Sequence, residues 1–495
     1  MSVDAKIILR ALGLVVHVPG LMAIASLPVC WLFNEAYAVP PFLWTALASL
    51  TLGQLLYRCF RPAEEIRLHH AMLVAALAWI LVPLLGAIPL LAIASQLAGN
   101  AATSVEFQQP WDAIFEAFSG FTGTGLSVSL HPSRLPHSLQ WWRSFTEWVG
   151  GVGVIVLMLS ILRPSAGAHQ LYFSEAREEK ILPSVASTVR MIWWIYLLLT
   201  TSSILLLRAA GIPWWEAVNH GMTGIATGGF TVTDASMRDY SPGVQILLMG
   251  IMLAGATSFA VHYRILTRGK LTALWGDSQH RALWLLAGIG AIALLMENFW
   301  YTASFLWMET LFQWVSALAT AGFQTVDLGA WSPTAQLLLS FAMVLGGAAG
   351  STAGGIKQVR FVYLIKGVLW RFRAASLRPH ELAHYAVNGQ SVSEADASRS
   401  VESAAVLGTL WLLLLGTGIL VLLHVVPPRF TLSEVILEVA SAQGNVGLST
   451  GITHPDLPWP GKLTLILSMW MGRLEIIPVL ILLASPFSRR TKRGG

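Results

Sequence analysis

The chain has 495 residues, of which 55% are hydrophobic and only 12% are charged. A mean hydropathy of +0.63 excludes a soluble protein and predicts a polytopic membrane protein, because a soluble domain of this length could not bury that much apolar surface. The net charge of +5 does not indicate nucleic-acid binding, since the basic residues lie between apolar runs and not on one solvated domain.

Apolar runs of about 20 residues are long enough to cross a bilayer. Ten such runs lie near residues 7–33, 41–58, 70–95, 140–162, 187–210, 243–266, 281–303, 334–368, 402–426 and 461–486. The first run is long for the core of a signal peptide and lacks a convincing cleavage site, so we expect it to remain as a span. Cys30 and Cys59 fall at the far ends of successive runs and are not expected to pair. Lysine and arginine concentrate in alternate loops, which predicts that both termini are cytoplasmic.

A short segment between two spans recurs four times when the chain is aligned without gaps on Gly125, Gly229, Gly322 and Gly447. Thirteen residues before each of these glycines stands an acid, namely Asp112, Glu216, Glu309 and Glu434. Six residues before each glycine stands a hydroxyl residue, namely Ser119, Thr223, Ser316 and Ser441. This regularity predicts a fourfold internal repeat of span, short pore helix, filter turn and span.

The predicted fold is an all-α polytopic membrane protein. Four pseudo-symmetric repeats surround a central pore, and two N-terminal transmembrane helices stand outside the repeats. We expect the N-terminal helices in residues 1–66, pore repeat 1 in 67–163, pore repeat 2 in 164–270, pore repeat 3 with a glycine-rich gating loop in 271–370, and a cytoplasmic loop with pore repeat 4 in 371–495.

The four filter turns indicate a pathway for cations. Non-helical backbone is tolerated at membrane depth only where it is buried in protein or lines a water-filled cavity. Glycine lets successive carbonyls face one axis and replace the hydration shell of an ion, and the negative ends of the short helices point the same way. The four acids could form a negative ring at the outer mouth, helped by Asp234, Asp239, Asp327 and Asp456. They could equally be helix-start residues only.

A cluster of glycines interrupts the span after the third filter turn, and it comprises Gly346, Gly347, Gly350, Gly354 and Gly355. Each glycine in a helix interior costs about 1 kcal/mol relative to alanine, which favours an unwound segment below the filter. Close helix packing through small residues is the alternative, and the residues alone favour neither. Lys357 follows directly, and it could lie at the pore or extend its side chain to the cytoplasm.

Arg473 lies inside the last apolar run. Because a central arginine costs roughly 2.5–3.5 kcal/mol on insertion scales, it should face water or a partner. Glu475 stands two residues later and points to another face of the helix. We therefore expect Arg473 to project toward the pore and the glycine cluster, with a structural ion pair to Glu475 or another span as the alternative. His220 and Glu438, on short helices, are expected to be packing residues and not ligands.

Several specific motifs stand together in this chain. They include residues 148–153 (Trp-Val-Gly-Gly-Val-Gly), 226–230 (Ala-Thr-Gly-Gly-Phe), 320–323 (Thr-Ala-Gly-Phe), 350–355 (Gly-Ser-Thr-Ala-Gly-Gly) and 445–447 (Asn-Val-Gly). Together they resemble the membrane subunit of the bacterial Trk/Ktr potassium-uptake family, of the TrkH and TrkG type, over nearly the whole chain. Residues 448–451 (Leu-Ser-Thr-Gly) are more like the Ktr branch, which leaves the branch and any sodium dependence open.

This resemblance implies that backbone carbonyls of the filter hold potassium ions. The matching residues are Gly123, Thr124, Gly125, Thr227, Gly228, Gly229, Thr320, Ala321, Gly322, Asn445, Val446 and Gly447. It also implies that the glycine loop gates the pore, with Arg473 as an electrostatic barrier. Family members form homodimers in the bacterial inner membrane and work with a cytosolic nucleotide-binding subunit of the TrkA or KtrA type, so any nucleotide would act only through that partner.

The sequence contains no phosphate-binding loop, no metal-spaced His/Cys set and no nucleophile motif, so we do not expect an enzyme or a covalent cofactor. Two function classes remain. The first is a channel-like potassium pathway that is driven by the membrane potential, and the second is a potassium symporter coupled to sodium or protons. Fourfold filter repeats favour the first class, because secondary transporters more often show inverted repeats around broken helices.

Overall fold

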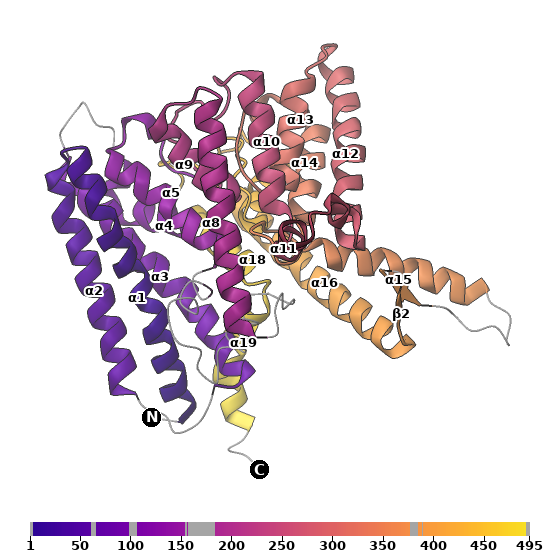
Figure 1. Cartoon of the computed structure of the whole chain (residues 1–495), viewed down its shortest axis with the longest axis horizontal. Helices are drawn as coiled ribbons and strands as arrows, with labels where there is room; N and C mark the ends of the chain where they lie inside the picture. The colour runs from indigo at the N-terminus through magenta and orange to yellow at the C-terminus, as the bar shows by residue number, and fades with distance from the viewer. Residues whose placement is uncertain are drawn as a thin grey trace.

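The computed structural model describes residues 3–60, 66–98, 106–153, 156, 184–376, 385–388 and 390–491. Within these ranges the chain is helical except for loops and one short hairpin, in which β1 (Ala386–Val387) pairs with β2 (Gln390–Ser391). The first turn of α1 (Val3–Leu32) and the last turn of α19 (Ile477–Thr491) lie at the same end of the molecule (Figure 1). The prediction of an all-α polytopic architecture is confirmed.

The two N-terminal helices, α1 and α2 (Val39–Cys59), pack along each other at one edge of the molecule (Figure 1). Their main chains approach closely at Gly13, where a methyl group would lie 2.7 Å from Tyr57 N and 2.8 Å from Gly53 O. Only glycine permits this crossing, so the pair forms a tight hairpin against the first repeat.

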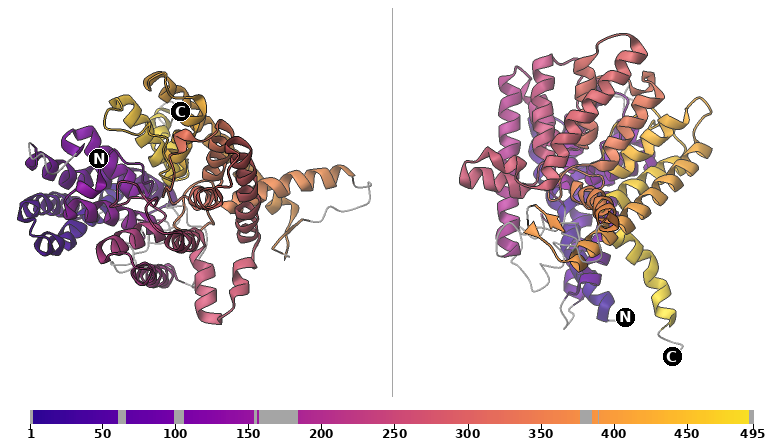
Figure 2. Two further views of the ribbon diagram at one scale, coloured as in Figure 1. Left: turned by 90° about the horizontal axis from the view of Figure 1, so that it is seen from above. Right: turned by 90° about the vertical axis from the view of Figure 1, so that its right-hand side faces the viewer.

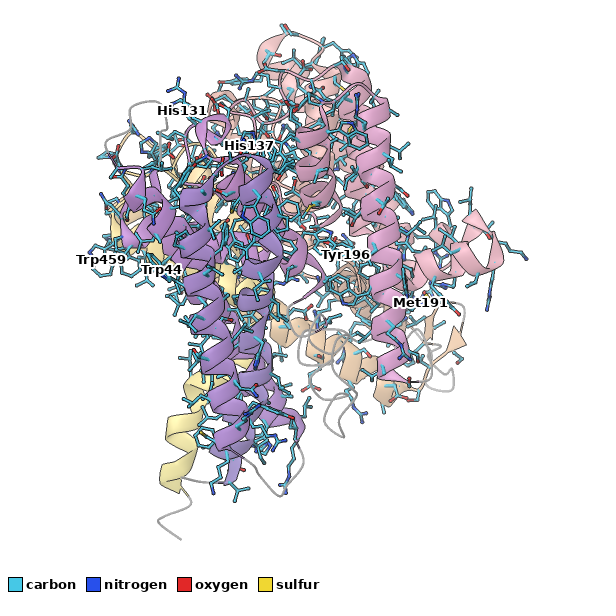
Figure 3. All side chains as sticks on the ribbon, turned by 60° about the vertical axis from the view of Figure 1, so that its left-hand side comes forward. Trp44, His131, His137, Met191, Tyr196 and Trp459 are labelled. Atoms are coloured by element: carbon cyan, nitrogen blue, oxygen red, sulfur yellow. The ribbon has the colours of Figure 1, made fainter. Side chains whose placement is uncertain are left out.

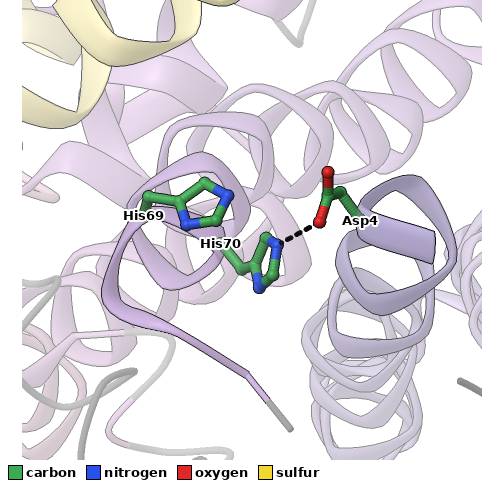
Figure 4. A group of neighbouring side chains, drawn as sticks. All are labelled: Asp4, His69 and His70. Carbon is green, nitrogen blue, oxygen red and sulfur yellow. Dashed lines mark hydrogen bonds and ion pairs between the residues drawn. The ribbon is translucent and has the colours of Figure 1, made fainter. Parts of the chain in front are cut away.

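Asp4 of α1 lies beside His69 and His70 at the start of α3 (Leu68–Gln96), as Figure 4 shows. His70 Nε2 is 3.0 Å from Asp4 Oδ1, and His70 Nδ1 accepts a hydrogen bond from the Arg67 N–H at 3.3 Å. Both ring nitrogens of His70 are therefore engaged. We interpret the cluster as a tie between α1 and α3 and not as a metal site.

Each repeat contains a long first helix, a short pore helix and a second helix, in the predicted order. The first helices are α3, α8 (Val185–Ala209), α12 (Ser278–Thr302) and α16 (Glu394–Val425). The pore helices are α4 (Pro110–Thr122), α9 (Trp214–Ile225), α13 (Trp307–Leu318) and α17 (Leu432–Gly444). The second helices are α5 (His137–Val152), α10 (Pro242–Ala256), α14 (Pro333–Leu345) and α18 (Trp459–Arg473). Short 3-10 turns lie between these helices, namely η1 (Ala36–Ala38), η2 (Glu106–Gln108), η3 (Pro132–Arg134), η4 (Leu271–Trp275) and η5 (Leu328–Ala330).

The four repeats close into a ring. The second helix of each repeat packs against the pore helix of the next, so that α5 contacts α9, α10 contacts α13 and α14 contacts α17. In the last repeat α18 packs against α4 of the first, which completes the circuit. Seen from above, in the left view of Figure 2, the repeats surround a common centre. All four pore helices therefore end near one axis.

Three of the ten predicted spans are broken within their second helices. Run 243–266 bends by 102° between α10 and α11 (Phe259–Arg268), and run 461–486 bends by 111° between α18 and α19. Run 334–368 is interrupted between α14 and α15 (Gln358–Ser376). Run 140–162 lies partly outside the described residues. The break in run 334–368 falls at the glycine cluster, where the sequence indicated an unwound segment. Hydropathy alone did not reveal the other two breaks.

The outer faces of the helices suit a lipid environment. Six helices in the described part of the chain are long and apolar enough to cross a membrane. On α12, the side chains of Leu285, Ile289 and Met296 follow one helical face and are more than half exposed. Trp44 and Trp459 are also exposed and lie at one level of the surface (Figure 3), as tryptophans do near a membrane interface. The chain is therefore a multi-pass membrane protein.

Candidate functional site

All four pore helices end with the same hydrogen bond. The N–H of the residue before each filter glycine donates to the carbonyl of the hydroxyl residue five positions earlier, at 2.8–2.9 Å. These pairs are Thr124 with Ser119, Gly228 with Thr223, Ala321 with Ser316 and Val446 with Ser441. This C-terminal cap requires a left-handed residue. That residue is Gly123, Thr227, Thr320 or Asn445, with φ between 52° and 67°.

The filter glycines themselves also have positive φ, between 75° and 102°. Each filter segment thus has positive φ at its first and third residues and not at its second. Such alternation turns successive carbonyls toward one side of the chain, the arrangement used by carbonyl-lined filters. The fixed spacing in the sequence therefore encodes one backbone conformation four times.

The four filter segments lie against one another in a closed ring. A methyl group added to any filter glycine would overlap the second-residue carbonyl of the next segment. The added methyl group would overlap Gly228 O at Gly125, Ala321 O at Gly229, Val446 O at Gly322 and Thr124 O at Gly447. Only glycine fits at these positions, and the four carbonyls encircle one axis.

A cavity of about 560 Å³ opens beyond this ring, and all four filter glycines line it. Its charged lining residues are Asp234, Asp327, Arg143 and Arg238. Two of the predicted helper acids, Asp234 and Asp327, thus lie at the mouth. The cavity is polar and open, so a hydrated cation can reach the ring from this side.

The four acids expected to ring the mouth lie instead in the first turns of the pore helices, and none lines the cavity. Each occupies the third helical position, where a carboxylate is favoured by the positive helix end. Glu434 forms a capping box with Thr431, and Glu216 accepts a hydrogen bond from the Tyr240 hydroxyl at 2.5 Å. The expected outer ring of Asp112, Glu216, Glu309 and Glu434 is corrected accordingly, and the helix-start alternative describes their places.

Asp112 is also half of a buried ion pair that joins the first and last repeats. Its carboxylate bonds Lys462 Nζ, and both side chains are 3% exposed. Lys462 also donates to Pro455 O at 2.6 Å. The pair therefore links α4 to α18 at the point where the ring closes.

Replacing Lys462 with methionine should leave the Asp112 carboxylate buried without its cation, which costs about 3–5 kcal/mol. We expect a clear fall in the melting temperature of the purified protein, measured by intrinsic fluorescence in detergent. Lys270→Met, at an exposed lysine, is the matched control and should melt like the parent. If the two variants melted alike, the ion pair would have no role in holding the ring closed.

The glycine cluster forms an unwound, buried loop between α14 and α15. Gly346, Gly350 and Gly355 have positive φ, between 54° and 73°, which explains the choice of glycine at these points. The loop's main chain is well paired, since Phe259 N–H donates to Gly350 O at 2.9 Å and Gln358 Nε2 donates to Gly346 O at 2.8 Å. The structure therefore has the unwound segment and not a continuous packed helix.

Two threonines tie this loop to the filter. Gly354 N–H donates to Thr320 Oγ1 of the third filter segment at 2.7 Å. The Thr352 hydroxyl lies 3.2 Å from Thr227 Oγ1 of the second segment and donates to Ile225 O at 3.0 Å. The loop thus sits directly below the filter, on the side away from the 560 Å³ cavity.

Thr320→Val should loosen the loop while leaving the filter backbone in place. It removes the acceptor of the buried Gly354 N–H, a loss of about 1–3 kcal/mol, and valine fills the same space. We expect cation flux through the protein alone to rise by roughly fivefold to a hundredfold, with unchanged selectivity, in tracer uptake by proteoliposomes. Thr417→Val, at an exposed threonine, is the control, and equal flux in both variants would refute the tie.

Below the loop, a small chamber of about 30 Å³ is lined by Gly350, Gly354, Lys357, Arg473 and Trp79, among others. Arg473 donates to Gly150 O and, at 3.2 Å, to Gly151 O, and its guanidinium lies 5.1 Å from the Trp79 ring centroid. Lys357 Nζ donates to Ala353 O within the loop. Arg473 and Lys357 therefore line the same chamber as the loop residues Gly350 and Gly354.

Glu475 does not pair with Arg473 but forms an ion pair with Arg360 of α15. This contact joins the bend after α18 to the helix after the glycine loop. Trp79 and Glu147 had no sequence signal, although Glu147 accepts the Phe230 N–H at 3.1 Å directly behind the second filter segment. Their places follow only from the packing of distant repeats.

Comparisons with known proteins agree with this arrangement. The family of TrkH cation transport proteins matches residues 42–490. An uncharacterized cation transporter of Methanocaldococcus jannaschii is 33% identical over 97% of this chain and 96% of its own length. The Trk system potassium uptake protein TrkH of Halomonas elongata is 31% identical over 98% of this chain and 99% of its own. The crystal structure of the potassium transporter TrkH from Vibrio parahaemolyticus is 27% identical, has a TM-score of 0.83, and covers 97% of this chain and 99% of its own.

Proposed function

Because this chain belongs to the TrkH family of cation transport proteins, we propose that it takes up potassium through a channel-like selectivity filter. The observation that carries the proposal is the closed ring of four filter segments, in which the carbonyls of Thr124, Gly228, Ala321 and Val446 each face the glycine of a neighbour. A ring of carbonyls can replace the hydration shell of potassium. The twelve residues of the four segments are the proposed ion ligands.

The proposed gate is the loop of residues 346–355 with Lys357 and Arg473 below it. The chamber of about 30 Å³ between them is too narrow for a hydrated ion. Glu475 also lines the chamber but is paired with Arg360, so Lys357 and Arg473 are the charges that oppose the entry of a cation. Opening would require the loop to move away from Thr320 and the chamber to widen.

A sodium- or proton-coupled symporter is the alternative mechanism. Coupled transporters commonly place their site between inverted repeats, whereas the four repeats here follow one another around a single axis in the same sense. This arrangement favours conduction driven by the membrane potential.

We also propose the setting in which the protein works. The concentration of lysine and arginine in alternate loops supports cytoplasmic termini in a bacterial-type inner membrane. A cytosolic nucleotide-binding subunit of the TrkA or KtrA type would regulate the gate, and a second copy of the chain would complete a homodimer. Cross-linking of the purified complex tests both associations.

The proposed function is tested by rubidium-tracer uptake into proteoliposomes that hold this chain alone, under an inside-negative potential. We expect uptake that excess potassium blocks and that needs neither sodium nor a proton gradient. Uptake that required either gradient would establish the symporter. Liposomes without protein and protein in liposomes without a potential are the controls.

A further inference from the structure

The residue nine positions before each filter glycine is polar in all four repeats, namely Glu116, His220, Gln313 and Glu438. These side chains are at most 1% exposed. Burying a polar side chain is unfavourable unless hydrogen bonds compensate it. Four such residues at one register therefore need a common role, although sequence reasoning assigned His220 and Glu438 to packing.

In the first repeat, Glu116 holds the chain that leaves the filter. Its carboxylate accepts the Val128 N–H at 3.0 Å and the Ser127 hydroxyl at 2.8 Å. Arg143 Nε donates to the same carboxylate at 2.7 Å, and Arg143 Nη1 donates to Thr231 O of the second repeat at 3.0 Å. The charge of Glu116 is thus neutralised locally.

In the fourth repeat, Glu438 makes the equivalent contacts without a cation. Its carboxylate accepts the Thr450 N–H and the Thr453 N–H, both at 3.0 Å, and the Ser449 hydroxyl at 2.8 Å. The Thr453 hydroxyl donates to it as well. Among the residues that the structure describes, every donor to this carboxylate is neutral. Glu438 therefore differs from Glu116, whose carboxylate is paired with Arg143.

The second and third repeats have neutral residues at this position, and within the described ranges only His220 of the two accepts a backbone N–H as the glutamates do. His220 Nε2 accepts the Val232 N–H at 3.3 Å, and Gln313 Nε2 donates to Thr325 Oγ1 at 3.1 Å. In every repeat a partner lies three residues after the filter glycine, as Val128, Val232, Thr325 or Thr450. The contact is therefore a fourfold feature whose chemistry differs between quarters.

We infer that these four side chains are positioning residues for the filter, and that the Glu438 carboxylate also sets how tightly the filter holds potassium. By fixing the chain beyond each glycine, they fix the direction of the carbonyl before it. Opposite charges interact strongly across a poorly solvated interior, so a cation in the filter would be attracted by an ionised Glu438 carboxylate. This inference rests on the proposed potassium function.

Glu438→Gln tests the charge with little change of volume. The amide nitrogen would face an N–H or hydroxyl donor, so both the charge and part of the contact are lost. In rubidium uptake by proteoliposomes, we expect the potassium concentration that gives half-maximal block to rise about tenfold. This is the low end of the effect expected from losing a hydrogen bond to a charged group. The potassium-to-sodium preference should fall with it. Glu402→Gln, at an exposed glutamate, should behave like the parent.

A melting curve with and without potassium separates positioning from simple stability. We expect the parent, but much less the Glu438→Gln variant, to be stabilised by potassium. Equal stabilisation together with unchanged block by potassium and sodium would overturn the inference. If Glu438→Gln does not fold, Thr453→Val removes one donor to the carboxylate and keeps its charge, so it tests the positioning role. We expect a lower potassium-to-sodium preference, and an unchanged preference would overturn that role. A parent without potassium-blocked uptake would instead overturn the proposed function itself.

Discussion

Replacing Arg473 with alanine should raise potassium flux through the protein alone by about thirtyfold. The guanidinium lies in the chamber below the glycine loop, held by Gly150 O and Gly151 O. A unit charge about 8 Å from a passing ion opposes it by roughly 2 kcal/mol at an effective dielectric constant of 20, which corresponds to about thirtyfold in rate. Alanine removes this repulsion and also widens the chamber.

The measurement is the initial rate of rubidium uptake into proteoliposomes at a fixed potential. Arg473→Lys retains the charge and should conduct like the parent, which separates charge from shape. Arg399→Ala removes an arginine that is 81% exposed and should have no effect. A folded Arg473→Ala protein with equal or lower flux would show that Arg473 is not the barrier.

Replacing Gly125 with serine should abolish much of the preference for potassium over sodium. Gly125 has φ of 81°, and a Cβ atom there would overlap Gly228 O of the next filter segment. The left-handed backbone alone costs roughly 1–2 kcal/mol with a side chain, and the overlap forces the neighbouring carbonyl to move. A displaced carbonyl would no longer match the proposed potassium site, so we expect a fall of at least about tenfold in selectivity.

The selectivity is measured as the ratio of the potassium and sodium concentrations that each halve rubidium uptake. Gly211→Ser is the matched control, because Gly211 has φ of 95° and no atom within 4 Å of an added Cβ. It carries the same backbone strain without the overlap. Unchanged selectivity in a folded Gly125→Ser protein would remove this glycine from the filter.

The fourfold register could be predicted because each repeat must build the same helix cap and the same left-handed glycine. The hydroxyl six residues before Gly322, for example, is Ser316, whose carbonyl caps the helix at 2.8 Å. The glycine loop was recognised as a candidate because several glycines in one span conflict with a continuous helix. Local backbone requirements are visible in the sequence whenever only a few residue types can meet them.

Other features depend on contacts between distant segments. The bend between α10 and α11 carries no glycine or proline at residues 257–258, where Thr257 is extended and Ser258 caps α11. The Arg360 partner of Glu475 lies more than one hundred residues away. The shared register of the polar residues behind the filter was not recognised, because Glu, His and Gln share a position but not a chemical type. Such features can be recognised only once the packing of the closed ring is known.

The contact that closes the ring also determines when the filter can be completed during synthesis. Asp112 and Lys462 are separated by 350 positions. The ion pair between α4 and α18 therefore cannot form until the last repeat has been synthesised. At about 5–20 residues per second, this interval lasts roughly 20–70 s. Until the last repeat has been inserted, the nascent chain holds three quarters of a filter and no complete carbonyl ring. A ribosome that stalls within the fourth repeat therefore leaves a membrane protein without a selective conduit.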